Sequence, residues 1–504
     1  MYRDTYAFTS STLRSSRLQR ELQDLRDERR ALCRFPRSSQ SAFGEPRTRP
    51  QLRNDAAAHD ALSSGDLDKI RDIFKSKDSV NAVLETVSHE LSWSAELALW
   101  SLISKPKQTS ALHITAERGH TACVKHLLGH GADANASPGG ATALHAACAN
   151  GHVECAQLLL RIGANPNVIS DEGYAPLHLC TGPQTLLCAK LLLEHGARVN
   201  MQTRDREITP LHVAAKHGLD KHVDLYLSYC AFSHKKNREG ETALNAACSY
   251  AEKPEAFGRY YRVCEMLINC GSDVKTAGKK NHTPLHNACG NGHPGIVDLL
   301  LLHGACVNAK NCAGYTPMDC ILQAVEDHLE HHPEQIVIAL LNHGAAPVDP
   351  KTLKQCAMSP WTMEALLNTY ESIPLCDSWI EAVPLDVWQK HQIFFESIIH
   401  MTNKPRCLQH LARCTLRNYL GTRCHSVITQ LQIPNSFTEF LLLKFEGYLN
   451  PAGRASQRSA ACDDVALCVL IVAAVEVGRN LLSRHFAGTR LSAAREHGVR
   501  GQYF

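Results

Sequence analysis

Histidine and cysteine are the side chains in this sequence best suited to chemistry, since the chain carries 28 histidines and 21 cysteines. His126 and His130 share an i, i+4 spacing, and His328, His331 and His332 form a cluster. A structural zinc site needs several such ligands at close, recurring spacings. The sequence contains no CxxC pair and no zinc-finger spacing. We therefore expect no metal site and no cofactor.

Motifs of catalysis are missing as well. The sequence has no P-loop, HExxH or GxSxG pattern, so it offers no candidate catalytic residue and we do not expect an enzyme. Many cysteines stand where alanine would serve, as in "AAC" at 146–148 and 246–248. Reduced, buried thiols of this kind are typical of a reducing compartment. We expect a cytoplasmic protein, with the nucleus as a second location.

The charge of the chain is nearly balanced, with a net charge of +3, which does not favour nucleic acid as the main ligand. Residues 1–53 carry twelve arginines and six acids, and this composition predicts a basic, partly disordered arm over residues 1–54. The sequence starts without the apolar stretch of a signal peptide. Its longest uncharged apolar run, Val465–Val475, is too short to span a bilayer. We expect no membrane partner.

A repeated unit organises the middle of the chain. One tetrapeptide recurs at steps of 32, 33, 34, 33, 41 and 33 residues. Its seven copies are SALH at 110–113, TALH at 142–145, APLH at 175–178, TPLH at 209–212, TALN at 242–245, TPLH at 283–286 and TPMD at 316–319. All steps but one are close to the period of about 33 residues that is typical of ankyrin repeats.

Each copy contains the features of a helix pair. Thr or Ser can cap the first helix, and Pro suits the first helical turn. His at the fourth position can bridge the backbone and the Thr hydroxyl. The second helix carries a leucine run, as in Cys155–Leu160, and stops at glycines such as Gly163, where a left-handed residue needs no Cβ. These copies closely resemble the ankyrin repeat, which implies a solenoid of stacked helix pairs.

The chain ends in a different kind of element, the stretch "PRCLQHLARCTLRNYLG" at 405–421. Its apolar side chains follow i, i+3, i+4, i+7 spacing on one helical stripe, with Arg413 and Arg417 off it. The stripe consists of Leu408, Leu411, Ala412, Thr415, Leu416 and Tyr419.

This stretch resembles the opening helix of the SOCS box, in which Leu, Cys and an aliphatic residue recur at every fourth position. The matching residues here are Leu408, Ala412 and Leu416, with Ala in place of Cys. Leu431-Gln432-Ile433-Pro434 is similar to the Leu-Pro-Leu-Pro-like motif of that box, with Gln in place of the first Pro. In the family the helix inserts into elongin C and the second motif contacts a cullin.

Ankyrin repeats followed by a SOCS box define the ankyrin repeat and SOCS box family, which this chain resembles over about residues 1–449. The leader and residues 85–96 are similar to one member in particular. The implied fold is all-α, an ankyrin solenoid followed by a small helical SOCS box. The predicted segments are the arm at 1–54, an atypical repeat and connector at 55–107, seven repeats at 108–347, a helical cap at 348–402, the SOCS box at 403–449 and a divergent tail at 450–504.

The resemblance implies a substrate receptor of a cullin-RING ubiquitin ligase. The SOCS box would bind elongin C and elongin B through Leu408, Leu411, Ala412 and Leu416. It would bind a cullin of the fifth type, with its RING protein, through Leu431, Ile433 and Pro434. The repeats would hold an unknown protein substrate. The alternative is an ankyrin scaffold whose altered box no longer recruits a ligase.

Two further surfaces are predicted within the repeats. The loops that follow the fourth and fifth copies form a basic patch that we expect to receive an acidic or phosphorylated segment of the substrate, unless it is only a solvated rim. The patch consists of Lys235, Lys236, Arg238, Lys275, Lys279 and Lys280. The long step of the fifth copy places an insertion within Ser249–Arg262. Its aromatic residues (Tyr250, Phe257, Tyr260 and Tyr261) either bind a partner or pack back on the neighbouring repeat.

Overall fold

The computed structural model describes residues 56–94, 99–251, 253–373, 377–404 and 406–444. This part of the chain is helical apart from one two-stranded hairpin, so the expected all-α class is confirmed with one addition. It forms two compact units, the first ending at Pro284 and the second beginning at Leu285. The predicted arm, tail and apolar run Val465–Val475 lie outside the described residues.

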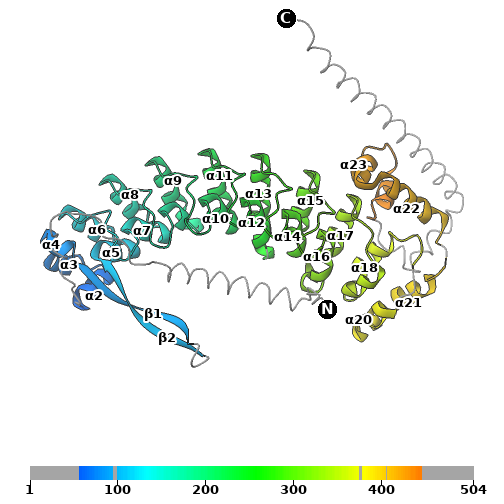
Figure 1. Ribbon diagram of the computed structural model, residues 1–504, viewed down its shortest axis with the longest axis horizontal. Helices are drawn as coiled ribbons and strands as arrows, with labels where there is room; N and C mark the ends of the chain where they lie inside the picture. The colour runs from blue at the N-terminus through cyan, green and yellow to red at the C-terminus, as the bar shows by residue number, and fades with distance from the viewer. Residues whose placement is uncertain (1–55, 95–98, 252, 374–376, 405, 445–504) are drawn as a thin grey trace, which may run out of the picture. The chain divides into compact units, whose positions relative to one another are not determined.

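The first unit is a row of helix pairs, which Figure 1 shows standing side by side. An opening pair, α2 (Ala56–Ser64) and α3 (Leu67–Ile73), is followed by the short α4 (Lys77–Val80). The repeats are then α5 (Ala111–Arg118) with α6 (Thr121–Gly129), α7 (Ala143–Asn150) with α8 (Val153–Arg161), the 3₁₀ turns η1 (Pro176–Leu179) and η2 (Pro183–Thr185) with α9 (Leu186–Glu194), α10 (Pro210–Lys216) with α11 (Asp220–Ser228), and α12 (Ala243–Tyr250) with η3 (Pro254–Ala256) and α13 (Phe257–Asn269).

The connector before the first regular repeat contains a β-hairpin that the sequence reasoning did not predict. Strands β1 (Val83–Ser94) and β2 (Leu99–Ser110) pair antiparallel from Val83 opposite Ser110 to Ser94 opposite Leu99. Figure 1 shows the hairpin projecting from the first unit beside α5. The sequence analysis treats residues 85–96 as part of the connector at 55–107 and assigns no strand to them.

A recurring capping contact joins the first helix of a repeat to the next repeat. The backbone N–H of Thr142 donates to Nδ1 of His145 at 3.1 Å. Nε2 of His145 is therefore the protonated nitrogen, and it donates to the carbonyl of Tyr174, one repeat further on, at 3.1 Å. Asn245 makes the same two kinds of contact, with Thr242 and with the carbonyl of Thr276. The expected bridging role of the fourth tetrapeptide position is confirmed.

The insertion of the fifth repeat packs back on the fourth. Tyr260, in the first turns of α13, is buried and donates its hydroxyl to the carbonyl of Lys216 at 2.8 Å. Both Nε and Nη2 of Arg262 contact Asp220 Oδ2 of α11, at 2.9 and 2.8 Å. Tyr250 remains more exposed, with the ammonium group of Lys216 above its ring. The packing alternative therefore holds for Tyr260.

The second unit begins with two more repeats and then changes character. Its helices are α14 (Pro284–Gly290, with Pro284 in the first unit), α15 (Pro294–Leu302), α16 (Pro317–Ala324), η4 (Glu326–His331), α17 (Pro333–Asn342), η5 (Pro350–Cys356), α18 (Pro360–Leu367), α19 (Asp377–Ile380), α20 (Leu385–Lys390), α21 (Gln392–Met401), α22 (Leu408–Leu420), η6 (Gly421–Arg423), α23 (Cys424–Ile428) and α24 (Asn435–Leu441). Helix α18 packs on α17, with Met363 and Leu366 fully buried, so it covers the end of the last repeat.

Candidate partner-binding site

Helix α22 carries an apolar stripe that faces solvent. Leu408, its first residue, is 69% exposed, and Tyr419 near its end is 43% exposed. Thr415 lies between them and is also exposed, while Leu411 and Ala412 are half-buried. These five residues, which we call the outer stripe, share one side of the helix because they lie three or four positions apart.

The opposite side of α22 is buried although it is polar. Arg413 is 1% exposed, and His410 and Arg417 are also buried. An amphipathic helix at the surface of a monomer normally turns its apolar side inward and its charged side outward. Helix α22 buries Leu416 and Leu420 in this way, but it also buries both arginines and leaves Leu408 exposed. The arginines that the sequence placed off the stripe are therefore the residues that hold the helix to the rest of the unit.

Arg417 joins α22 to the last ankyrin repeat. Its Nη1 donates to Oδ1 of Asn342, the last residue of α17, at 2.6 Å and to the carbonyl of Leu441 at 2.7 Å. The side-chain amide of Asn342 donates in turn to the carbonyl of Leu442 at 2.7 Å. We call this arrangement the Arg417–Asn342 bridge. It satisfies the carbonyls at the end of α24, which have no partner within their own helix.

A second polar cluster fixes the middle of α22. His410 Nε2 donates to the carbonyl of Tyr370 at 2.8 Å, and Arg413 donates to the carbonyl of Asn368 at 3.3 Å and stacks on the ring of Phe440. Burial, helped by the charge of Arg406, lowers the pKa of His410 to about 4. His410 is therefore neutral at physiological pH, which agrees with its Nδ1 accepting from Nη2 of Arg413 at 3.0 Å.

The three short helices that follow close a small apolar core with α22. Its buried members are Leu416, Leu420, Cys424, Ile428, Phe440, Leu441 and Leu442. Leu416 is only 2% exposed. The sequence analysis predicts an elongin contact for Leu416; its side chain packs within the chain, and the contact stays a prediction. Ala412 packs partly against the same core.

The second half-motif lies at the start of α24. Pro434 is the exposed N-cap of this helix, and its backbone carbonyl accepts from the N–H groups of Phe437 and Thr438. Ile433 packs partly against the small apolar core that α22 forms with the helices after it, and Leu431 is half-buried. Pro434 is the most accessible of the three predicted cullin contacts. Binding of a cullin by these residues stays a prediction.

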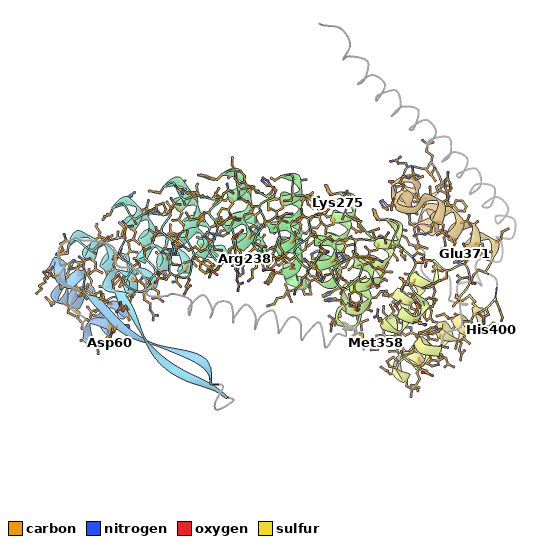
Figure 2. The ribbon with its side chains drawn as sticks, viewed as in Figure 1. Asp60, Arg238, Lys275, Met358, Glu371 and His400 are labelled. Atoms are coloured by element: carbon orange, nitrogen blue, oxygen red, sulfur yellow. The ribbon has the colours of Figure 1, made fainter. Side chains whose placement is uncertain are left out.

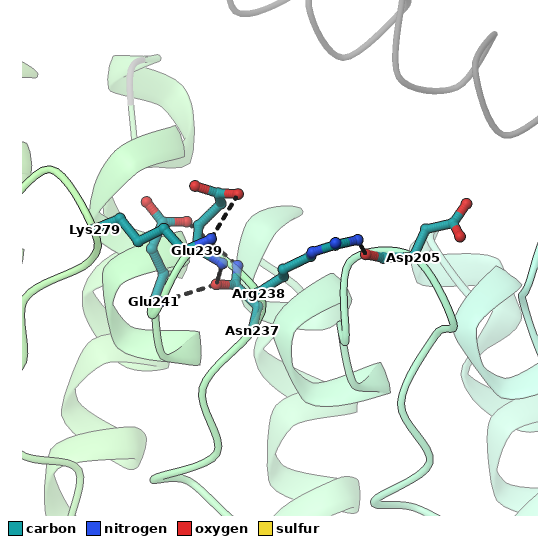
Figure 3. A network of polar contacts seen from close by, with 6 residues as sticks. All are labelled: Asp205, Asn237, Arg238, Glu239, Glu241 and Lys279. Atoms are coloured by element: carbon teal, nitrogen blue, oxygen red, sulfur yellow. Dashed lines mark hydrogen bonds and ion pairs between the residues drawn. The ribbon is translucent and has the colours of Figure 1, made fainter.

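The six predicted substrate-binding residues lie on two neighbouring loops of the first unit, 229–241 and 270–282. Lys235 is half-buried and the other five are exposed. Lys279 lies 3.7 Å from the carboxylate of Glu239, and Arg238 donates to the carbonyl of Asp205 at 3.0 Å (Figure 3). The structure thus brings the two loops together as expected, and substrate binding by them stays a prediction.

Within the described ranges, the structure groups no three His, Cys, Asp or Glu side chains in a way that could hold a metal ion. In the same ranges, no helix has the length and apolar character needed to cross a bilayer. The rings of His126 and His130 contact each other at a tilt, and the rings of His328 and His331 are stacked. Burial lowers the pKa of His126.

Sequence reasoning missed the residues that orient the outer stripe. The sequence of α22 contains no acid that could pair with Arg413 and Arg417. This absence could have indicated that the two arginines bind acceptors elsewhere in the chain. Asn342 gave no signal, since it ends an ordinary repeat helix and meets Arg417 only in the folded chain.

Comparison with known protein families agrees with this division into repeats and a terminal module. The ankyrin repeats family matches residues 59–170, 112–205, 177–257 and 255–352, and the SOCS box family matches residues 404–442. The fold and the terminal helices thus define a repeat protein that carries a SOCS box.

Close relatives share both parts. The chain is 47% identical over 451 residues to ankyrin repeat and SOCS box protein 16 of Homo sapiens, covering 89% of this chain and 99% of that protein. The corresponding values for protein 16 of Mus musculus are 48%, 88% and 99%. Ankyrin repeat and SOCS box protein 18 of Homo sapiens is 42% identical over 77% of this chain and 85% of its own length. The chain belongs to the ankyrin repeat and SOCS box family, and the predicted likeness to protein 16 is confirmed.

Proposed function

We propose that this protein is the substrate-recognition subunit of an elongin–cullin–SOCS box ubiquitin ligase. The SOCS box recruits elongin C with elongin B, and the ankyrin repeats hold the target. The single observation that supports this best is the exposed outer stripe of α22. Leu408, which matches the leading Leu of the elongin-binding pattern, is 69% exposed within this stripe.

The outer stripe has the physical properties of a helix that docks in a groove. Leu408, Leu411, Ala412, Thr415 and Tyr419 follow the i, i+3, i+4, i+7 spacing of groove-binding helices. The Arg417–Asn342 bridge and the His410 cluster hold the helix before a partner arrives. Binding then loses little conformational entropy, which favours affinity.

Recruitment of a cullin is the finer part of the proposal. We propose a cullin of the fifth type with its RING protein, contacted through Leu431, Ile433 and Pro434. The exposed position of Pro434 supports this, whereas Gln432 departs from the family motif in an exposed place. The cullin contact is therefore expected to be weaker than in a box with two prolines.

The protein itself makes and breaks no covalent bond in this proposal. It holds a target lysine near a ubiquitin-charged enzyme, which raises the effective concentration of one reactant at the other. We propose that this occurs in the cytoplasm and also in the nucleus.

The rival function is an ankyrin scaffold that has lost ligase recruitment. The observation in its favour is Ala412, which replaces the Cys of the family pattern and is half-buried against the module core. A smaller side chain at this place offers less apolar surface to elongin. Ala412→Cys should therefore strengthen elongin binding if the proposed function is right.

Co-purification tests the proposal with the full chain. We expect elongins B and C to co-purify with the native sequence and not with a Leu408→Asp variant, since the exposed face would then carry a charge. A Gln409→Asp variant is the matched control, because Gln409 lies beside the outer stripe on the same turn. If neither elongin co-purifies with the native chain, the scaffold function is favoured.

A further inference from the structure

A ladder of asparagines joins neighbouring loops of the first unit. The side-chain amide of Asn167 donates to the carbonyl of Gly196 at 3.0 Å, and its Oδ1 accepts from the N–H of Arg198 at 2.8 Å. Asn81, Asn135 and Asn200 make the same pair of contacts with the next loop. Each asparagine thus contributes two hydrogen bonds to the stacking of the repeats.

The ladder is interrupted in the two loops that carry the basic patch. His234 and Lys275 stand four positions after the positive-φ residue that follows the preceding helix, which is where Asn135, Asn167 and Asn200 stand in their loops. His234 and Lys275 are both exposed. The hydroxyl of Ser233, which donates to the carbonyl of Cys270 at 3.1 Å, takes over part of the joining role. At these two positions, exposed basic side chains stand in place of the asparagines that hydrogen-bond to the next loop. Since these side chains do not stabilise the stacking of the repeats, we infer that they serve binding.

The same two loops differ in charge from the first loops of the row. Together, 229–241 and 270–282 contain six Lys and Arg side chains against three carboxylates, a net charge of +3. Loop 131–141 contains Asp133 and no Lys or Arg, and loop 163–175 contains two acids and no Lys or Arg. Loop 196–208, directly before the first basic loop, contains three Arg and two acids, a net charge of +1. Among these five loops, net positive charge therefore begins at loop 196–208 and is highest in loop 270–282.

The carboxylates of these loops are already engaged. Asp273 accepts from the N–H of Lys275 at 2.9 Å and from the hydroxyl of Thr276 at 3.3 Å. Glu239 lies 3.7 Å from Lys279, the only member of the six with a carboxylate partner among the ion pairs of the described residues. Five cations therefore keep their charge available for an external anion.

Backbone contacts hold the loop tips in fixed positions. Oδ1 of Asn237 accepts from the N–H groups of Glu239 and Glu241, both at 2.9 Å, and so closes the turn that presents Arg238 (Figure 3). The N–H of Arg238 donates to the carbonyl of Arg206 in the preceding loop at 2.9 Å. Arg238 and Lys275, both labelled in Figure 2, thus come from neighbouring loops of one ordered row. A fixed array of cations binds an anion without first being ordered.

We propose that loops 229–241 and 270–282 form a docking surface for a carboxylate- or phosphate-rich segment of a protein. The proposal rests on the proposed function in so far as that segment belongs to the ligase target. A nucleic acid fits less well, because its long polyanionic backbone needs an extended basic stripe. Here the acidic loop 163–175 lies two loops before the first basic one.

Fluorescence anisotropy with the full chain tests the surface. The probes are a short Glu-Ser peptide, the same peptide with phosphoserine, a neutral Gly-Ser peptide and a short single-stranded RNA. The test variant combines Lys235→Glu, Lys236→Glu and Lys275→Glu. The matched control combines Lys125→Glu, Arg161→Glu and Lys221→Glu, which change the net charge equally on exposed parts of the outer helices.

We expect the native chain to prefer the acidic and phosphorylated peptides over the neutral one. The Kd for the preferred peptide should rise about ten-fold or more in the test variant and much less in the control. A preference for the phosphorylated peptide would identify phosphate as the natural anion. Equal affinities for the native chain and the test variant, an equal loss in the control, or tighter binding of RNA than of either peptide would overturn the proposal.

Elongin co-purification, measured on the same preparations, keeps the two proposals apart. Both triple variants should retain elongins, because loops 229–241 and 270–282 belong to the first unit and α22 to the second. Peptide binding that is lost in the test variant while elongins are retained supports the surface. Peptide binding without elongin recruitment by the native chain would count against the proposed function alone.

Discussion

Truncating two leucines of α22 that hold equivalent positions in the family pattern should affect different properties, partner binding in one case and folding stability in the other. Leu408 is 69% exposed and Leu416 is 2% exposed. We predict that Leu408→Ala weakens elongin binding and leaves the fold intact. Leu416→Ala should unfold the SOCS box and so lose binding only as a secondary effect.

The magnitudes follow from the exposed fractions. Full burial of a leucine side chain is worth roughly 1.5–3 kcal/mol. About two thirds of the Leu408 side chain remains to be covered by a partner, which gives about 1–2 kcal/mol, or a roughly 5- to 30-fold increase in Kd. The covered third limits the loss of folding stability to about 1 kcal/mol or less. Leu416→Ala removes a fully packed side chain and should cost about 2–5 kcal/mol of folding stability.

Titration calorimetry with purified elongin B–C measures the first effect, and thermal unfolding of the same samples measures the second. Gln409→Ala serves as the control, since it changes a half-buried polar residue on the same turn. The reasoning would be refuted if Leu408→Ala lowered the melting temperature as much as Leu416→Ala while elongin affinity stayed unchanged. In that case the helix would be a structural cap of the repeats.

Three further predictions concern the fold. Burial lowers the pKa of His178 to about 4, below its ordinary value of 6.5. Between pH 4 and pH 6.5 the unfolded chain therefore binds more protons than the folded chain. The free energy of unfolding should fall as pH falls through this range, by up to about 1.4 kcal/mol per pH unit. His178→Asn, which copies Asn245, should reduce this slope in urea unfolding, and an unchanged slope would contradict the assignment. Cys230, two residues after the end of α11, has a φ of 60°, where Gly is favoured. Cys230→Gly should therefore raise the urea midpoint by a stability gain of about 0.5–1 kcal/mol; a lower midpoint would show that its side chain stabilises the turn. Tyr260→Phe loses the bond to the carbonyl of Lys216 and should cost about 1–2 kcal/mol of stability, whereas a neutral effect would mean that water replaces the hydroxyl.

The repeats could be predicted from the sequence because their determinants are local. Thr142 and His145 cap one helix within a single tetrapeptide, and Gly163 ends the next at positive φ. Such features recur at a fixed period, so each copy supports the reading of the others. The β1–β2 hairpin has no second copy and was missed for that reason.

The orientation of α22 could not be predicted, because its determinants are distant in sequence. The stripe itself was visible in the spacing of Leu408 and its neighbours, but the side that turns inward depends on acceptors elsewhere. Asn342 lies 75 positions before Arg417. From the spacing alone, Leu408 and Leu416 lie on the same apolar stripe, and nothing in the local sequence shows that one is exposed and the other buried.

The Arg417–Asn342 bridge also bears on how this chain can be divided. Sequence patterns suggest a cut just before the SOCS box, but that cut would leave the amide of Asn342 and the guanidinium of Arg417 on separate fragments, each without its buried partner. A second contact that the cut would break is made by Gly344, which follows the last repeat helix. A Cβ at this position would lie 2.7 Å from the backbone of Thr422, so the backbones of the last repeat and of the SOCS box are in direct contact here. Grafting this box onto another ankyrin protein should therefore work only if the last repeat is transplanted with it. The unit that evolution or an engineer can exchange is larger than the motif that names it.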